Sequence, residues 1–128
     1  MDIDNLKEVN DMLGHSTGDA LLKSFAGILM LVFGDCEFVG RMGGDEFMAV
    51  ITGEMVDDVP GLIEELQKKI DESNSSKQNF EYSISYGTAS SDDIDYGRRV
   101  FDLYMLADKR MYEMKNRRRE EELISYEK

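Results

Sequence analysis

The sequence has almost no cysteine, no excess of positive charge and no long apolar run. Cys36 is the one cysteine, so no internal disulfide can form, and we interpret it as a small apolar strand residue in a reducing compartment. The net charge is −12, which gives no electrostatic footprint for DNA or a membrane surface. No apolar run approaches membrane-spanning length and no signal peptide is visible. We therefore expect a cytoplasmic chain without nucleic-acid or membrane contacts.

The composition is that of an ordinary soluble domain. Of the 128 residues, 41% are hydrophobic and 33% are charged. A chain of this length can bury one core without disulfides or structural metal. We predict that residues 1–128 form a single domain whose end, 117–128, is a basic and then acidic helical tail.

Apolar spacing predicts four helices and three strands. The helices cover about 5–13, 18–33, 60–73 and a last segment from about 99. Gly14 ends the first helix, and Ser16 or Thr17 caps the second. Strands are predicted near 36–41 and 46–52 and within 80–89. This interleaving predicts an α/β (α+β) fold, with a mixed, mainly antiparallel sheet covered by helices.

Residues 40–47 read GRMGGDEF and lie between the first two predicted strands. Two adjacent glycines are a common hairpin turn, because glycine accepts positive φ without a steric cost. That interpretation explains Gly43 and Gly44. It does not explain why Asp45, Glu46 and Phe47 follow in that order, although Phe47 fits a core position.

Asp2 and Asp4 flank Ile3 at the start of the chain. Residues two apart on a strand point to the same face, so both carboxylates could converge on a cation such as Mg²⁺. An EF-hand loop is excluded, because Leu6 stands where a third oxygen ligand belongs and Lys7 where the glycine belongs. Helix capping is the other interpretation for Asp4, and spacing alone favours it over a metal. For Asp2 the two interpretations are even.

Five motifs then resemble one known family in the same order: DIDNLKEVND, GHSTGDALL, RMGGDEF, SISYGTA and ADKRMYEMK. They are similar to the GGDEF domain of diguanylate cyclases, over nearly the whole chain to about residue 119. The resemblance implies a palm-like nucleotidyl cyclase architecture. It implies that two GTP molecules are joined into cyclic di-GMP with release of pyrophosphate. Each of two domains in a homodimer would hold one GTP.

The resemblance also implies a metal site. Asp2 matches the family's metal-binding aspartate, with the Ile3 carbonyl as a neighbouring ligand. Asp45 matches the metal ligand of the hairpin, and Glu46 the adjacent acid that binds a second cation or stabilises the transition state. The implied cofactor is Mg²⁺ or Mn²⁺. The two glycines before Asp45 would let the backbone lie close to the nucleotide.

Asn10 and Asp19 match the pair that reads guanine. An aspartate accepts from guanine N1–H and the exocyclic amine, and an asparagine amide both donates and accepts. Without the resemblance, we would interpret Asn10 as a solvated helix residue. Asp19 would then complement the helix dipole in a first turn.

Leu6 and Lys7 match positions near the phosphates, and Lys115 and Arg119 match two basic positions that contact the terminal phosphates. The arginines at 117–118 are interpreted as a solvated basic helix end, which the macrodipole favours.

Two departures from the family pattern affect the expected activity. Residues 34–37 read GDCE where many members carry an RxxD product-inhibition site, so we expect no such feedback. The family's opening helix and most of its first strand are missing before Asp2. We therefore expect these 128 residues alone to form cyclic di-GMP slowly or undetectably, and an upstream part of the parent could tether it to a membrane. The alternative is a catalytically weak or inactive GTP-binding regulatory or interaction domain.

Overall fold

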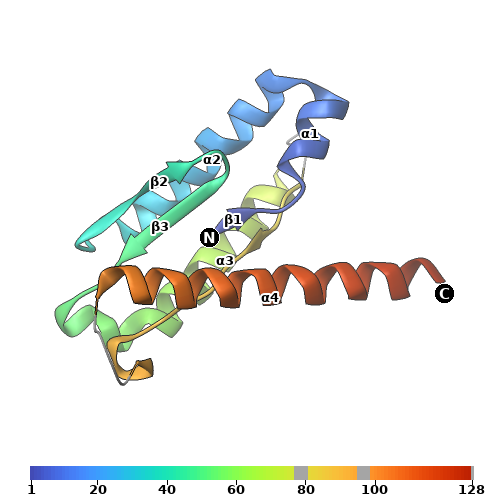
Figure 1. The fold of residues 1–128 in the computed structure, drawn as a ribbon. Helices are drawn as coiled ribbons and strands as arrows, with labels where there is room; N and C mark the ends of the chain where they lie inside the picture. Colours follow the sequence, from blue (N-terminus) through green and yellow to red (C-terminus); the bar gives the residue numbers. More distant parts are fainter. Residues whose placement is uncertain (77–80, 95–98, 128) are drawn as a thin grey trace. The chain divides into compact units, whose positions relative to one another are not determined.

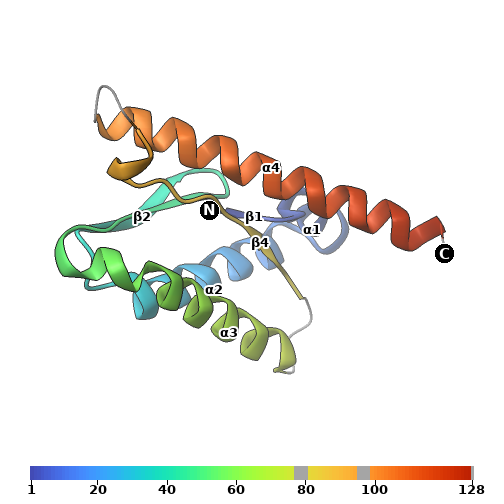
Figure 2. The same ribbon diagram turned by 90° about the horizontal axis from the view of Figure 1, so that it is seen from below.

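The computed structural model describes residues 1–76, 81–94 and 99–127, and it divides into two compact units (Figures 1 and 2). One unit contains Met1–Asp4 and Ile84–Lys128, and the other contains Asn5–Ser83. Each unit combines helical residues with an antiparallel strand pair. The predicted mixed class with antiparallel strands is confirmed, and the single domain stays a prediction.

The unit Asn5–Ser83 holds three helices and a hairpin. Its elements are α1 (Leu6–Leu13), α2 (His15–Phe33), β2 (Phe38–Gly43), β3 (Glu46–Val50), a 3₁₀ helix (Gly53–Asp58) and α3 (Val59–Ser75). The predicted helices lie within three residues of those observed. The predicted cap of α2 was wrong, because Gly14 precedes the helix and Thr17 Oγ1 instead donates to the Leu13 carbonyl at 3.1 Å.

The core of this unit forms around one face of α2. Leu21, Phe25 and Leu29 are spaced four residues apart and are at most 1% exposed. The Phe25 ring packs edge-to-face on Phe47 at 5.0 Å and on Tyr82 at 6.2 Å between centroids. Burial raises the pKa of the Tyr82 hydroxyl. The predicted core position of Phe47 is confirmed.

Residues 81–83 do not continue the last predicted strand. The Asn74 side chain donates to the Tyr82 carbonyl at 2.8 Å and accepts from the Tyr82 N–H at 3.1 Å. Both backbone groups of Tyr82 are thereby satisfied by a side chain at the end of α3. Strand β4 begins after this contact and covers Ile84–Ser85. Phe80, in the same predicted strand, lies outside the described residues.

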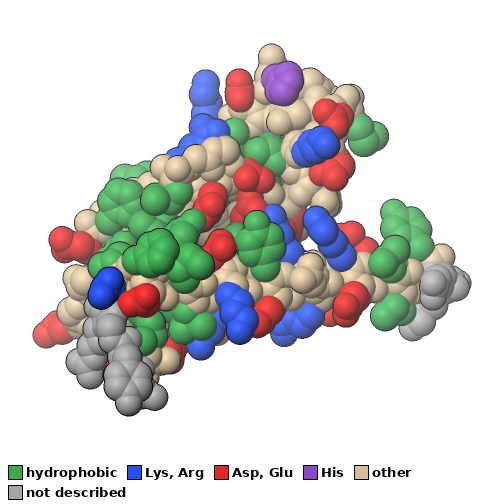
Figure 3. Space-filling model, viewed as in Figure 1, with side chains coloured by type: hydrophobic (Ala, Val, Ile, Leu, Met, Phe, Trp, Pro, Cys, Tyr) green, Lys and Arg blue, Asp and Glu red, His purple; other side chains and the backbone are tan. Residues whose placement is uncertain are grey.

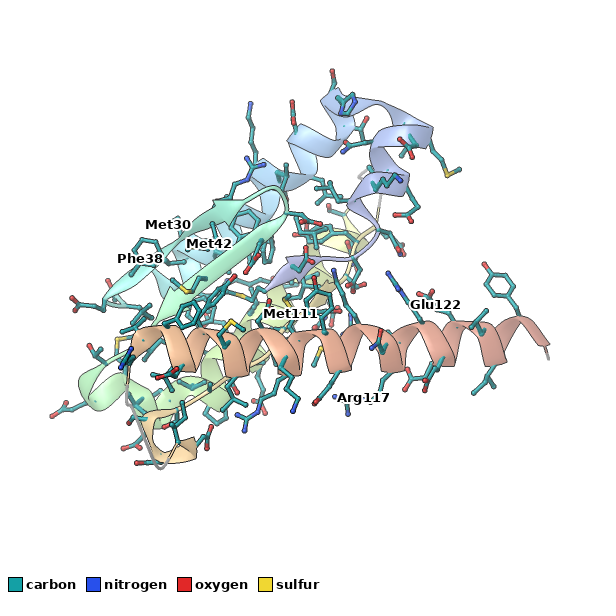
Figure 4. All side chains as sticks on the ribbon, viewed as in Figure 1. Met30, Phe38, Met42, Met111, Arg117 and Glu122 are labelled. Carbon is teal, nitrogen blue, oxygen red and sulfur yellow. The ribbon has the colours of Figure 1, made fainter. Side chains whose placement is uncertain are left out.

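An apolar surface lies where the hairpin meets α2. Met30 on α2 and Phe38 and Met42 on β2 are between 44% and 59% exposed. Figure 3 shows hydrophobic side chains gathered over this part of the molecule, and Figure 4 labels the three residues. The hairpin therefore covers α2 only in part.

Helix α2 also has the length and apolar composition of a membrane-crossing helix. The sequence prediction overlooked it because glycine, Asp19 and Lys23 interrupt its apolar runs. One face is buried in the core just described, as in the central helix of a soluble protein. This property by itself is weak support for a membrane span.

The other unit is built on two very short strands and one long helix. Its elements are β1 (Asp2–Ile3), β4 (Ile84–Ser85), a 3₁₀ helix (Ser91–Asp93) and α4 (Val100–Glu127). Strands β1 and β4 pair antiparallel, with Asp2 opposite Ser85 and Ile3 opposite Ile84. Helix α4 continues to Glu127, so residues 117–127 are helical.

Candidate active site

The two carboxylates of the DID segment, Asp2 on β1 and Asp4 directly after it, face basic residues of α4. Lys115 Nζ forms an ion pair with Asp2 Oδ2, and Arg118 Nη1 pairs with Asp4 Oδ2 at 2.8 Å. Residues two apart on a strand share a face, and residues three apart on a helix do too. Each carboxylate therefore meets one cationic side chain.

Asp2 occupies a sheltered position for a charged group. The residue is 7% exposed, and the side chain of Lys115 that pairs with it is 20% exposed. The Lys115 ammonium also lies 5.9 Å from the centre of the Tyr112 ring. A buried carboxylate needs a compensating cation, and here the lysine provides it. A divalent cation could compensate the same charge, so the carboxylate oxygens of Asp2 suit its predicted role as a metal ligand.

Asp4 does not cap a helix. The residue before α1 is Asn5, which has a left-handed backbone with φ 61° and makes no side-chain cap hydrogen bond. The Asp4 carboxylate instead accepts from Ser85 Oγ at 2.7 Å and from Arg118. The capping interpretation of Asp4 was wrong because two stronger partners from distant parts of the chain bind the same oxygens.

The basic residues in the second half of α4 also differ from expectation. Arg118 was predicted to be solvated, and it is paired with Asp4 instead. Arg119, predicted to contact phosphates, is exposed and has no ion pair with any residue that the structure describes. Spacing could have indicated Arg118. It lies three residues after Lys115, on the same face of α4, and Asp4 lies two residues after Asp2, so the second pair can follow the first. The phosphate contacts of Lys115 and Arg119 stay predictions.

The hairpin places the family's acidic pair at its tip. Its two-residue loop is Gly44-Asp45, and Gly43 pairs with Glu46 at the end of the ladder. The loop is one residue later than a turn made of the two glycines, because the ladder shifts register between Arg41 and Gly43. Asp45 therefore lies in the turn itself and Glu46 begins β3. Both acids are half-buried.

The conformation of the tip is held locally. Gly44 has φ 54°, a left-handed backbone that glycine adopts without strain. Its carbonyl accepts from Arg41 Nε at 2.6 Å. The arginine of RMGGDEF thus closes the loop from the preceding strand. Sequence reasoning gave this arginine no role.

Asn10 and residues 18–19 come together because α1 and α2 are joined by the single residue Gly14. Asn10 is half-buried, and its Oδ1 lies where a β-carbon would stand on the buried residue Gly18. Asp19 is exposed beside it and lies beyond the first turn of α2, so the first-turn dipole interpretation was wrong. Leu6 is buried and Lys7 is exposed on α1.

No three His, Cys, Asp or Glu side chains gather as a metal cluster within the described ranges 1–76, 81–94 and 99–127. Asp2 belongs to one unit, and Asp45 and Glu46 belong to the other. The predicted metal ligands thus form two groups: a β1 group of Asp2 and Ile3, and a hairpin group of Asp45 and Glu46.

Cys36 takes no part in either group. It lies before β2, so the predicted strand position was wrong. Burial, and then the neighbouring Asp35 carboxylate, raise the pKa of its thiol. The neutral thiol is favoured at physiological pH, as expected for a non-reactive cysteine.

Comparison with known proteins identifies the family. The family model described as "Diguanylate cyclase, GGDEF domain" matches residues 1–121. A diguanylate cyclase of Vibrio cholerae is 32% identical over 115 residues, covering 90% of this chain and 35% of that protein. Diguanylate cyclase DosC of Escherichia coli is 31% identical over 123 residues, covering 93% of this chain and 26% of that protein.

A third relative has no assigned activity. An uncharacterized membrane protein of Staphylococcus saprophyticus is 31% identical over 130 residues, covering 98% of this chain and 36% of that protein. The chain thus spans about a third of the length of curated relatives that it matches. With its motifs in order and the family match over residues 1–121, the chain belongs to the GGDEF domain family.

Proposed function

We propose that this domain is a diguanylate cyclase, which condenses two GTP molecules into cyclic di-GMP and releases two pyrophosphates. In each half of the reaction a 3′-hydroxyl oxygen bonds to the α-phosphorus of the other GTP. The bond from that phosphorus to the β-phosphate bridging oxygen breaks, and the hydroxyl loses its proton. The strongest support is that residues 43–47 are intact within a family match covering residues 1–121.

Asp2, Asp45, Glu46 and the Ile3 carbonyl would hold Mg²⁺ or Mn²⁺, which fit their oxygen donors. The bound cation would draw charge from the phosphates and lower the pKa of the attacking hydroxyl. Lys115 would then exchange its ion pair with Asp2 for the terminal phosphates, together with Arg119. A lysine suits this exchange because its ammonium is a point charge on a flexible stem.

Guanine would be read by Asn10 and Asp19; the Asn10 side chain lies against Gly18, the residue before Asp19. The Asp19 carboxylate would accept from guanine N1–H and the exocyclic amine, donors that adenine lacks at those positions. A site that leaves a polar group unpaired rejects the wrong base strongly. Leu6 and Lys7 would lie near the phosphates, and the hairpin glycines would allow close approach of the backbone.

Two such domains are needed, because each holds only one GTP, so we propose a homodimer as the working form. A cytoplasmic location would supply GTP and Mg²⁺. One relative bears the name of a membrane protein, which is compatible with a tether elsewhere in a longer chain.

The second candidate function is GTP binding without turnover. One observation favours it: the Lys115 ammonium already neutralises Asp2. If that pair persisted with GTP bound, the carboxylate would not serve a cation.

One experiment distinguishes the two functions, and it uses the full product of the gene that encodes this chain. GTP and ATP binding are measured by calorimetry with Mg²⁺, and products are followed by chromatography. Guanine-selective binding with cyclic di-GMP formation supports the cyclase, and its loss in Asp45→Asn supports the metal assignment. Selective binding without product supports the second candidate, and equal binding of GTP and ATP contradicts both.

A further inference from the structure

Arg118 is not a solvated side chain, because its guanidinium contacts two other parts of the chain. Its Nη1 donates to Asp4 Oδ2 at 2.8 Å and to the Ile84 carbonyl at 2.6 Å. One guanidinium nitrogen on α4 therefore binds both a side chain next to β1 and the backbone of β4. Its neighbour Arg117 is exposed and has no such partner among the residues that the structure describes (Figure 4).

The Asp4 carboxylate, which Arg118 binds, is largely buried. Asp4 Oδ1 accepts from Ser85 Oγ at 2.7 Å, and Ser85 is 0% exposed. The side chain of Asp4 is 14% exposed and that of Arg118 is 34% exposed. Hydrogen bonds to charged groups are stronger than neutral ones, and burial limits screening by salt. Asp4 is thus the point at which β1, β4 and α4 are tied together.

Strand β1 needs such a tie because it is only two residues long. Its antiparallel pairing with β4 covers Asp2–Ser85 and Ile3–Ile84 and nothing more. A strand with so little pairing opens readily. Any displacement of β1 would move the Asp2 carboxylate with it.

We propose that Arg118 is a positioning residue: acting through Asp4, it holds β1 on β4 and so fixes the direction of the Asp2 carboxylate. The inference rests on the proposed function in one respect, that Asp2 is a metal ligand. In this role Arg118 would act only through Asp4 and the backbone of β4, without contact to nucleotide or metal.

Lys115 and Arg118 then divide two tasks along one face of α4. Lys115 can leave Asp2 when a cation and phosphates arrive, because β1 remains held by Arg118. Arginine suits the fixed task, since its planar fork loses less freedom for each hydrogen bond formed. A single lysine could not both hold the strand and follow the phosphates.

The holding role is tested without any ligand by hydrogen–deuterium exchange. Arg118→Ala should raise the exchange rate of residues 2–4 and 84–85 by about tenfold, because local opening becomes easier there. Arg117→Ala, on the next residue of the same helix, should leave these rates unchanged. Arg118→Lys keeps the positive charge but not the planar fork, so it should restore part of the protection. Equal exchange in the wild type and Arg118→Ala would overturn the proposal.

The positioning role is tested by Mn²⁺ binding, measured by electron paramagnetic resonance in the presence of GTP. Loss of a residue that orients a metal ligand typically weakens metal binding by about tenfold to a hundredfold. We expect that loss in Arg118→Ala, partial recovery in Arg118→Lys and no change in Arg117→Ala. Guanosine binding should be unchanged in all three, whereas general unfolding would weaken it as well.

The outcomes separate this inference from the proposed function. If the wild type binds Mn²⁺ and Arg118→Ala binds it equally, the positioning role is wrong and the cyclase assignment stands. If the wild type binds GTP with no Mn²⁺ dependence, the metal role of Asp2 fails. The exchange rates of β1 and β4 then decide alone whether Arg118 holds the strand.

Discussion

Gly18→Ala should separate the stability of α2 from the recognition of guanine. A β-carbon at position 18 would overlap Asn10 Oδ1 and stand 2.8 Å from Asn10 Cγ. The atoms in the way belong to the end of a half-buried side chain, which can rotate toward solvent. The fold can therefore accept the methyl group, but Asn10 cannot keep its direction.

The two effects have opposite signs and can be estimated. Alanine is about 0.8–1 kcal/mol more favourable than glycine inside a helix, so the free energy of unfolding should not fall. If Asn10 loses its hydrogen bonds to the base, binding weakens by about 0.5–1.5 kcal/mol for each bond. For one or two bonds this is about tenfold in the dissociation constant of GTP, since about 1.4 kcal/mol corresponds to a factor of ten.

The assay is calorimetric titration with GTP and ATP, together with thermal unfolding. Gly27→Ala is the matched control on the same helix, because a β-carbon there would meet nothing within 4 Å. Both variants should be at least as stable as the wild type, and only Gly18→Ala should lose GTP affinity and selectivity over ATP. Unchanged GTP affinity in a folded Gly18→Ala would refute the assignment of Asn10 to the base.

Three further results are expected. Asp45→Asn should abolish turnover in the full gene product and leave the melting temperature nearly unchanged, because turn acids contribute little to packing; normal turnover would contradict its role as a metal ligand. The Ser90 backbone N–H, and then Arg110, lower the pKa of the Asp93 carboxyl, so its contribution to stability is present above the unfolded-state pKa and is lost as pH falls through the folded-state pKa. Arg110→Gln should raise that pKa in an NMR titration without fully restoring its ordinary value, and no change would argue against the 2.9 Å ion pair. Residues 34–37 lack the product-site arginine, so turnover should continue as cyclic di-GMP accumulates, and tight product binding there by calorimetry would show otherwise.

The sequence predicted those elements that local patterns determine. Helix α3 has its apolar side chains on one face and Pro60 in its first turn, and it was predicted at 60–73 against an observed Val59–Ser75. Apolar spacing predicted the core-facing residues of α2 in part. Of those predicted, Leu21, Phe25, Leu29 and Val32 are buried, Leu22 and Ile28 are half-buried, and Ala20 is exposed. Such features depend on residues only a few positions apart, so spacing alone reveals them.

The missed features depend on hydrogen bonds that the apolar pattern does not report. Arg118 and Asp4 are separated by 114 positions in the chain, and no local pattern reports that contact. Within the strand predicted at 80–89, the Asn74 side chain binds the backbone of Tyr82, which therefore does not join the sheet. The hairpin loop is shifted by one residue because the β2–β3 ladder has an irregular register next to Gly43. The first two features show side-chain contacts overriding the propensity of a segment.

The most direct test of the account is product formation by the full gene product incubated with GTP and Mg²⁺. Chromatography should show one cyclic di-GMP for every two pyrophosphates released, and no product with ATP. The rate should rise more than linearly with protein concentration, because two domains must meet. The account would be contradicted if GTP were bound selectively and no cyclic di-GMP appeared at any protein concentration.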